Sequence, residues 1–155
     1  MEHTLQTTMI LNGVAVTRAI PARQHLVDFL REELGLTGSH LGCEHGVCGA
    51  CTVRVNGDIV RGCLMLAVQA DGCRVETIEG LSDSKELFSL QKAFHEHNAL
   101  QCGLCTPGML LAAQELVSLN KKLTREEIRN HISGNYCRCT GYQAIVDAIE
   151  EVANG

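Results

Sequence analysis

Eight of the nine cysteines in this chain fall into two sets of four with different spacings. The first set follows the pattern C-x4-C-x2-C-x11-C and comprises Cys43, Cys48, Cys51 and Cys63. The second set joins a C-x2-C pair to a distant C-x-C pair and comprises Cys102, Cys105, Cys137 and Cys139. Thiolates are soft ligands that select iron–sulfur clusters, zinc or copper(I). The chain is therefore predicted to carry two metal centres.

The first set lies in a glycine-rich stretch, which reads GCEHGVCGAC from residue 42 to residue 51. Small residues let the backbone wrap closely and direct N–H groups at sulfur, which suits a [2Fe–2S] cluster. C-x4-C-x2-C with a distant fourth cysteine is also the plant-type ferredoxin spacing. Structural zinc, the alternative, usually uses C-x2-C pairs. A [2Fe–2S] cluster is predicted here, with His40 and His45 outside the ligand set because four cysteines complete it.

The second set is more ambiguous, because C-x2-C with C-x-C could also hold zinc. Both cysteine pairs precede predicted helices, so two helix N-termini would direct N–H groups and positive dipole ends at one thiolate-rich centre. A zinc tetrathiolate would be anionic too, so this geometry favours a second [2Fe–2S] cluster without excluding zinc. The ninth cysteine, Cys73, is expected to be a small buried apolar side chain at the start of a strand.

The first half of the chain is predicted to be a small mixed sheet packed on one helix. Asn-Gly pairs at residues 12–13 and 56–57 favour the tight turns of two hairpins. Apolar residues at helical spacing predict a helix that ends at Gly35. The second hairpin would bring Cys63 back beside Cys51. The expected elements are a hairpin, a helix, a second hairpin and a last strand, over residues 7–20, 24–34, 52–61 and 75–78.

The second half is predicted to be helical. Thr106 is expected as the N-cap of one helix, with Pro107 at the first helical position, where no backbone N–H is needed. Thr124 and Glu127 match a capping box at the start of another. The four expected helices span residues 86–97, 106–119, 124–134 and 142–152. A shift in composition near residues 80–84 divides the chain into a first domain, 1–80, and a second domain, 81–155.

Composition and charge exclude several classes of protein. A net charge of −5 and a pI near 5.8 argue against nucleic-acid binding, which needs clustered Lys and Arg. The first residues form neither a basic nor an apolar leader, and no apolar run approaches the ~18 residues typical of a membrane span. The cytoplasm is therefore the expected compartment, where reduced metal-binding thiols are favoured over disulfides. Bound clusters would help to stabilise two halves that are small for independent cores.

Three strings resemble a known family: residues 42–52 (GCEHGVCGACT), 101–108 (QCGLCTPG) and 135–142 (NYCRCTGY). Together they closely resemble the iron–sulfur subunit of the molybdenum hydroxylases, the family of xanthine dehydrogenase, aldehyde oxidase and carbon monoxide dehydrogenase. The resemblance covers almost the whole chain. It implies an α+β protein, in which a β-grasp [2Fe–2S] ferredoxin-like domain precedes a four-helix [2Fe–2S] domain.

The resemblance also implies a role and partners. Such a chain is a non-catalytic relay that passes electrons from molybdopterin through the helical-domain cluster and the ferredoxin-type cluster to FAD. A molybdenum-binding large subunit and an FAD-binding medium subunit would complete a heterotrimer or its dimer. Gln101 and Cys139 match residues that approach the pterin. The loop that faces the flavin subunit would comprise Glu44, His45, Gly46 and Val47.

Two other functions compete with this one. A free-standing ferredoxin-type electron carrier would need only the first half, so the four thiols of the helical half count against it. A zinc-stabilised interaction module is disfavoured by the charge and by the first spacing. The sequence leaves the substrate open among carbon monoxide, aldehydes, purines and N-heteroaromatic compounds, because the substrate pocket would belong to the molybdenum subunit.

Overall fold

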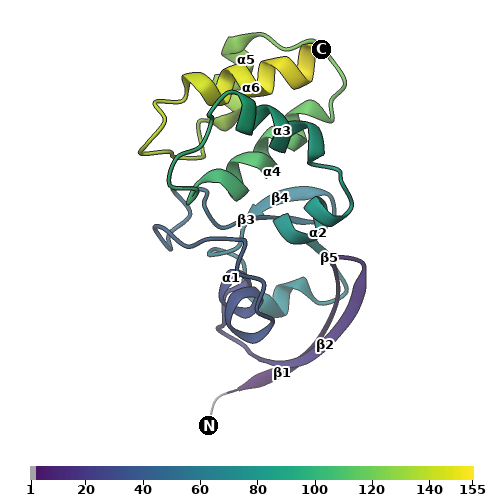
Figure 1. The fold of residues 1–155 in the computed structure, drawn as a ribbon. Helices are drawn as coiled ribbons and strands as arrows, with labels where there is room; N and C mark the ends of the chain where they lie inside the picture. The colour runs from purple at the N-terminus through teal and green to yellow at the C-terminus, as the bar shows by residue number, and fades with distance from the viewer. Residues whose placement is uncertain (1–2) are drawn as a thin grey trace.

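The computed structural model describes residues 3–155 and has a sheet half and a helical half stacked on one another (Figure 1). The strands are β1 (Thr4–Leu11), β2 (Val14–Pro21), β3 (Thr52–Val55), β4 (Asp58–Arg61) and β5 (Arg74–Glu76). Between them lie α1 (Leu26–Asp28), a π-helical turn η1 (Phe29–Glu33) and a 3-10 turn η2 (Ala67–Ala70). The helical half comprises α2 (Ile78–Asp83), α3 (Phe88–Glu96), α4 (Thr106–Val117), α5 (Arg125–Ile132) and α6 (Gln143–Asn154).

The five strands form one mixed sheet in the order β2-β1-β5-β3-β4. β5 runs parallel to β1 and antiparallel to β3, and the two hairpins are antiparallel. Both Asn-Gly turns have positive φ angles, with 48° and 85° at Asn12 and Gly13 and 51° and 96° at Asn56 and Gly57. These are the signs that a type I′ turn requires. Both predicted hairpins are confirmed, as is the α+β class.

The predicted helix over residues 24–34 is only partly correct. It begins as the short helix α1 and continues as the π-helical turn η1, before Gly35 ends it with a φ of 68°. Its apolar side is buried against the sheet. The core of this half includes Met9, Ile20, Leu26, Phe29, Leu30, Val53 and Val75.

The predicted last strand, 75–78, is shorter than expected because the chain turns into α2 at Thr77. The Thr77 N–H donates to Asn12 Oδ1 at 2.9 Å, and Asn12 Nδ2 donates to Thr77 Oγ1 at 3.0 Å. Thr77 is thereby fixed as the N-cap of a helix that local periodicity did not predict. The helix includes residue 80, where the first domain is predicted to end, and Leu81 is buried in the helical core.

The four predicted helices of the second half are present as α3, α4, α5 and α6. The capping box of α5 is confirmed, since Glu127 N donates to Thr124 Oγ1 at 3.2 Å and Thr124 N donates to Glu127 Oε2 at 2.8 Å. The core of this half includes Leu87, Phe94, Met109, Ile128, Ile132, Ile145 and Ile149. Within residues 3–155, none of the helices is long and apolar enough to cross a membrane.

The predicted N-cap of α4 was wrong by one residue. Cys105 is the N-cap, and Thr106 is already the first helical residue. Cys105 adopts helical backbone angles, and its carbonyl accepts the first helical hydrogen bond, from Met109 N at 2.9 Å. A thiol of the second set therefore lies directly at a helix N-terminus.

Candidate metal centres

The first thiol set is built by a loop and a hairpin of the sheet half. Cys51 directly precedes β3, and Cys63 lies two residues after β4, so the hairpin returns one thiol beside the other. Gly62 N donates to Cys51 O at 3.1 Å, and both thiols are buried. Burial and the neighbouring Cys63 thiol raise the pKa of Cys51 to about 11. The predicted return of Cys63 to Cys51 is confirmed.

The other half of this set receives hydrogen bonds from the loop backbone. Cys48 N donates to Cys43 Sγ at 3.3 Å. This bond and another from the His45 backbone lower the pKa of Cys43 to about 6, which favours its thiolate. The turn is tight, because a Cβ on Gly42 would lie 3.0 Å from Cys48 Sγ. The glycines thus permit the wrapping that the sequence predicts.

The second set lies between the starts of two helices. Cys105 caps α4, while Cys137 and Cys139 occupy the loop before α6. Burial and the Cys137 thiol raise the pKa of Cys105 to about 12. A hydrogen bond with Cys102 raises the pKa of Cys139. The thiols therefore approach one another in two pairs, Cys105 with Cys137 and Cys102 with Cys139, and Cys102 and Cys139 are exposed.

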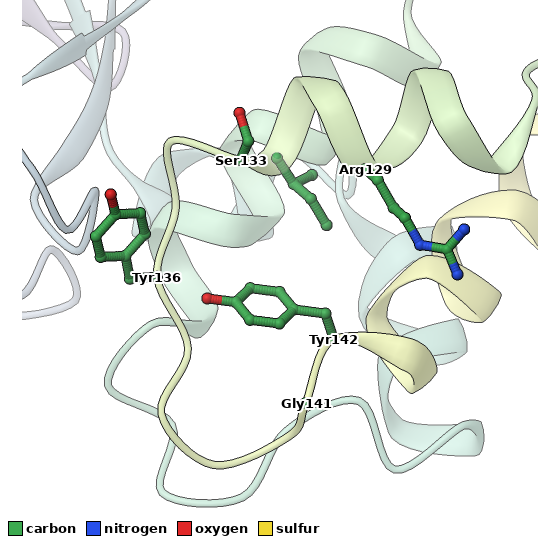
Figure 2. A pocket seen from close by; sticks show the side chains of 6 residues that line it. Arg129, Ser133, Tyr136, Gly141 and Tyr142 are labelled. Carbon is green, nitrogen blue, oxygen red and sulfur yellow. The ribbon is translucent and has the colours of Figure 1, made fainter.

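The loop that carries Cys137 is braced by its own residues. Thr140 donates to Cys137 Sγ twice, from its amide at 3.4 Å and from its hydroxyl at 3.1 Å. Burial raises the pKa of Cys137, but the Thr140 bonds and the Cys139 backbone outweigh it and lower the pKa overall. The ring of Tyr142 reaches across an open pocket of about 380 Å³ towards the loop (Figure 2), and its hydroxyl accepts from Cys137 N at 2.9 Å.

Both thiol sets have the chemistry that a binuclear cluster needs. The thiol neighbours that shift these pKa values belong to the same set: Cys51 interacts with Cys63 and Cys48, and Cys102 and Cys137 interact with both Cys105 and Cys139. Each set also contains a sulfur that accepts N–H hydrogen bonds, as cluster thiolates do. Within residues 3–155, no three His, Cys, Asp or Glu side chains gather closely enough to bind a single ion. A [2Fe–2S] cluster asks instead for two pairs of thiolates, one pair for each iron, and both sets fit this requirement.

The two groups of predicted contact residues, two for the pterin and four for the flavin subunit, lie at or near the surface. Gln101 Nε2 donates to Cys139 O at 3.1 Å, and both residues are exposed beside the second set. In the first set, His45 Nδ1 contacts the carbonyl of Cys43. Val47 is 43% exposed and Glu44 is exposed with a φ of 58°. The residues predicted to meet the pterin and the flavin subunit are therefore accessible, and their partners stay a prediction.

Three hydrogen bonds join the two thiol loops directly, and the sequence did not predict them. Tyr136 N donates to Cys48 O at 2.8 Å, and Asn135 Nδ2 donates to Gly49 O at 3.2 Å. His40 Nδ1 pairs with Leu104 O at 2.9 Å. Asn135 and Tyr136 belong to a string that the family resemblance singled out, but their partners lie more than 80 residues away along the chain.

This fold and its thiol sets define a protein with two iron–sulfur domains. Known protein families and proteins are similar to this chain over both domains. A 2Fe-2S iron-sulfur cluster binding domain matches residues 9–74, and a [2Fe-2S] binding domain matches residues 77–150. The caffeine dehydrogenase subunit gamma of Pseudomonas sp. (strain CBB1) is 50% identical, over 94% of this chain and 89% of its own length. The nicotine 6-hydroxylase small subunit of Paenarthrobacter nicotinovorans is 54% identical, over 90% of this chain and 84% of its own.

Solved structures agree. Quinoline 2-oxidoreductase from Pseudomonas putida 86 contains a chain that is 48% identical with a TM-score of 0.92, covering 97% of this chain and 94% of that one. Aldehyde oxidoreductase from Desulfovibrio gigas matches 96% of this chain at 41% identity and a TM-score of 0.88, but only 17% of its own longer chain. The same two domains thus also occur fused within a larger polypeptide.

The chain belongs to the iron–sulfur subunits of the molybdenum hydroxylase family. It is an electron-transfer subunit with two [2Fe–2S] domains in a multi-subunit oxidoreductase complex, and the molybdopterin and FAD belong to partner subunits. The match extends over both halves, which the free-standing ferredoxin alternative does not require.

Proposed function

We propose that this chain relays electrons from a molybdopterin in a large subunit to FAD in a medium subunit of a heterotrimer or its dimer. A [2Fe–2S] cluster supplies one-electron transfer at each site. The proposal is carried by the contact between the two thiol loops, where Tyr136 N donates to Cys48 O. Two metal sites whose loops touch are suited to electron transfer between them. Two metal sites that served only to stabilise separate domains would not need to be in contact.

The ligand sets follow from the spacing and the contacts. Cys43, Cys48, Cys51 and Cys63 would hold the first cluster. Cys102, Cys105, Cys137 and Cys139 would hold the second. The hydrogen bonds to Cys43 and Cys137 would help to keep these sulfurs anionic.

The orientation in the complex is proposed from exposure and from the resemblance. Gln101 and Cys139, exposed beside the second set, would face the pterin. Glu44, His45, Gly46 and Val47 would face the flavin subunit. Electrons would then enter at the helical half and leave from the sheet half. Residues 1–80 and 81–155 would be the two domains, and the cytoplasm would suit nine free thiols.

An N-heteroaromatic compound is the substrate class that we propose for the complex. The relatives named above include caffeine dehydrogenase, nicotine 6-hydroxylase and quinoline 2-oxidoreductase, and a further relative is nicotinate dehydrogenase. The substrate pocket itself would lie in the molybdenum subunit.

The test is purification of the native complex followed by metal analysis and reduction by candidate substrates. We expect about four iron and four acid-labile sulfides for each copy of this chain, together with molybdenum and FAD in copurifying subunits. An N-heteroaromatic substrate should reduce both clusters in the complex. Zinc without sulfide, or a chain that elutes alone at its own mass, would contradict the proposal.

A further inference from the structure

The two thiol loops meet at a buried junction whose atoms belong to the ligand segments themselves. Tyr136 N donates to the carbonyl of Cys48 at 2.8 Å. Cys48 belongs to the first thiol set, and Tyr136 directly precedes Cys137 of the second. One hydrogen bond therefore links the backbone of one ligand to the residue beside another. Tyr136 contributes its backbone here, so substitution of its side chain would leave this bond in place.

Asn135 holds this junction from inside. The residue is only 3% exposed, and its Nδ2 donates to Gly49 O at 3.2 Å, between Cys48 and Cys51. Its Oδ1 accepts from Arg61 Nη2 at 3.4 Å. The same guanidinium nitrogen donates to Gly134 O at 2.7 Å. Arg61, the last residue of β4, therefore also binds the backbone directly before Asn135. A buried carboxamide needs such partners on both sides.

The backbones of the two loops are so close that no side chain fits between them at two glycine positions. A Cβ on Gly49 would lie 2.6 Å from Asn135 Nδ2 and 2.8 Å from Gly134 O. A Cβ on Gly108, in the first turn of α4, would lie 2.1 Å from Gly49 O. Glycine at both positions permits an approach that any other residue would prevent. The separation of the two thiol sets is thus fixed by packed backbone and by the buried Asn135 carboxamide between them.

We propose that Asn135 is a positioning residue for electron transfer between the two clusters. The inference rests on the two clusters of the proposed function. In that step a cluster held by the second thiol set would lose one electron, and a cluster held by the first set would gain it. No bond forms or breaks. Asn135 keeps the Cys48 loop in register with Tyr136, and the electron would cross at that contact.

The test uses Asn135→Asp in the full chain with both clusters, alone and in its complex. Aspartate keeps the shape and the acceptor for Arg61, but it replaces the donor that faces Gly49 O with a second acceptor. The matched control is Asn154→Asp. Asn154 makes the same kind of backbone clamp in the helical half, donating to Leu123 O and accepting from Leu123 N, both at 2.9 Å.

The readouts are the magnetic interaction between the two chemically reduced clusters, measured by EPR, and the rate of intramolecular electron transfer after rapid reduction of the complex. We expect Asn135→Asp to weaken the magnetic interaction and to slow transfer several-fold, while iron and sulfide contents stay at the wild-type level. Asn154→Asp should lower stability but leave both readouts unchanged. An Asn135→Asp protein with wild-type coupling and rate would overturn the inference.

A second variant decides the matter if Asn135→Asp does not retain its clusters. Arg61→Gln leaves Asn135 in place but removes the cation that holds Asn135 and Gly134. We expect a smaller change in the same direction, and an unchanged coupling in Arg61→Gln would overturn the inference. A wild-type chain that lacks four iron and four sulfides would instead contradict the proposed function, so the two failures are distinguishable.

Discussion

The two thiol regions differ in how far the protein buries their sulfur atoms and in which groups donate hydrogen bonds to them. In the sheet half, Cys51 and Cys63 are 2% and 3% exposed, and the sulfur hydrogen bond comes from a backbone N–H. In the helical half, Cys102 and Cys139 are exposed, and a side-chain hydroxyl joins the backbone as donor. The fold therefore buries two of the four thiols in the first set and none of the four in the second. Burial by the sheet half and donation by a loop side chain are two different ways of setting the environment of a sulfur atom.

The largest expected effect is loss of one centre without the other. Cys137→Ala should lower the iron content from about four to about two per chain, because only the second cluster loses a ligand. The first cluster should keep its EPR signal. Cys73→Ala is the control, since Cys73 lies outside both sets. It is half-buried, less than the sequence predicts, and packs against the sheet core with its Sγ near the carbonyls of Gln69 and Asp71. Loss of both signals in Cys137→Ala would show that the centres depend on one another.

Thiol labelling of the cluster-free chain should separate the thiols by their pKa values. Cys43, with a pKa of about 6, should already be mostly thiolate at pH 7. Its alkylation rate should rise from pH 5 and level off above neutrality. Cys51 and Cys105, with pKa values of about 11 and 12, should stay slow and keep gaining rate up to pH 9. Peptide mapping by mass spectrometry measures each site, and equal rates at all three would contradict these environments.

Thr140→Val should change the potential of the second cluster only. The hydroxyl donates to Cys137 Sγ at 3.1 Å, and such a bond stabilises the more negative, reduced state. Losing about 1 kcal/mol of this stabilisation would lower the potential by roughly 40 mV for a one-electron couple. An EPR redox titration measures both clusters together. Thr140→Ser keeps the hydroxyl and should restore the potential; a matching shift of the first cluster would argue against a local effect.

The smallest expected effect concerns a second contact between the halves. Arg54 on β3 pairs with Glu86 through two hydrogen bonds, at 2.6 and 2.9 Å. Glu86→Gln should lower the free energy of unfolding by about 0.5–1 kcal/mol, and less at high salt. The Arg54 bond lowers the pKa of Glu86. Its contribution is therefore complete above the unfolded pKa and is lost as the pH falls through the lower folded value.

Chemical denaturation at pH 7 and at acidic pH would measure this contribution. Glu96→Gln is the matched control, because Glu96 pairs with Lys92 at 3.8 Å and both side chains are more than half exposed. It should change stability little. Both cluster signals should persist in Glu86→Gln, since this contact involves none of the eight thiols; loss of either signal would contradict that separation.

Local chemistry explains what the sequence predicted. The Asn-Gly turns specify both hairpins within a few residues, and the second hairpin then dictates where Cys63 returns. Helix starts were less reliable where tertiary contacts compete. Cys105 replaces Thr106 as the cap because its backbone is already helical, and α2 exists because Asn12 fixes Thr77 from 65 residues away. The π-helical geometry of η1 has no counterpart in the apolar spacing that predicted a helix.

The features of the candidate site also fall into those set by local sequence and those set by tertiary contacts. Spacing divides the eight thiols into two sets, and in the structure each set contains thiols that interact with one another. Their assignment as cluster ligands stays a prediction. Nothing in the spacing indicated that the two loops would meet. Asn135 contacts Gly49 across 86 residues, and such a pairing depends on how two cores pack together. The surface roles of Gln101 and of the Glu44–Val47 loop depend on partner subunits and stay predictions as well.

Asn12 joins a segment that is synthesised early to one that is synthesised much later. It turns the first hairpin with a φ of 48°, and its carboxamide also holds Thr77 at the start of α2. A Cβ on Gly80 would lie only 2.3 Å from Asn12 Oδ1, so the helix sits directly on the turn. N-terminal segments leave the ribosome first. The residue that anchors the first helix of the helical half is therefore synthesised about 65 residues before that helix. The order of synthesis places the anchor in the chain before the segment that docks on it.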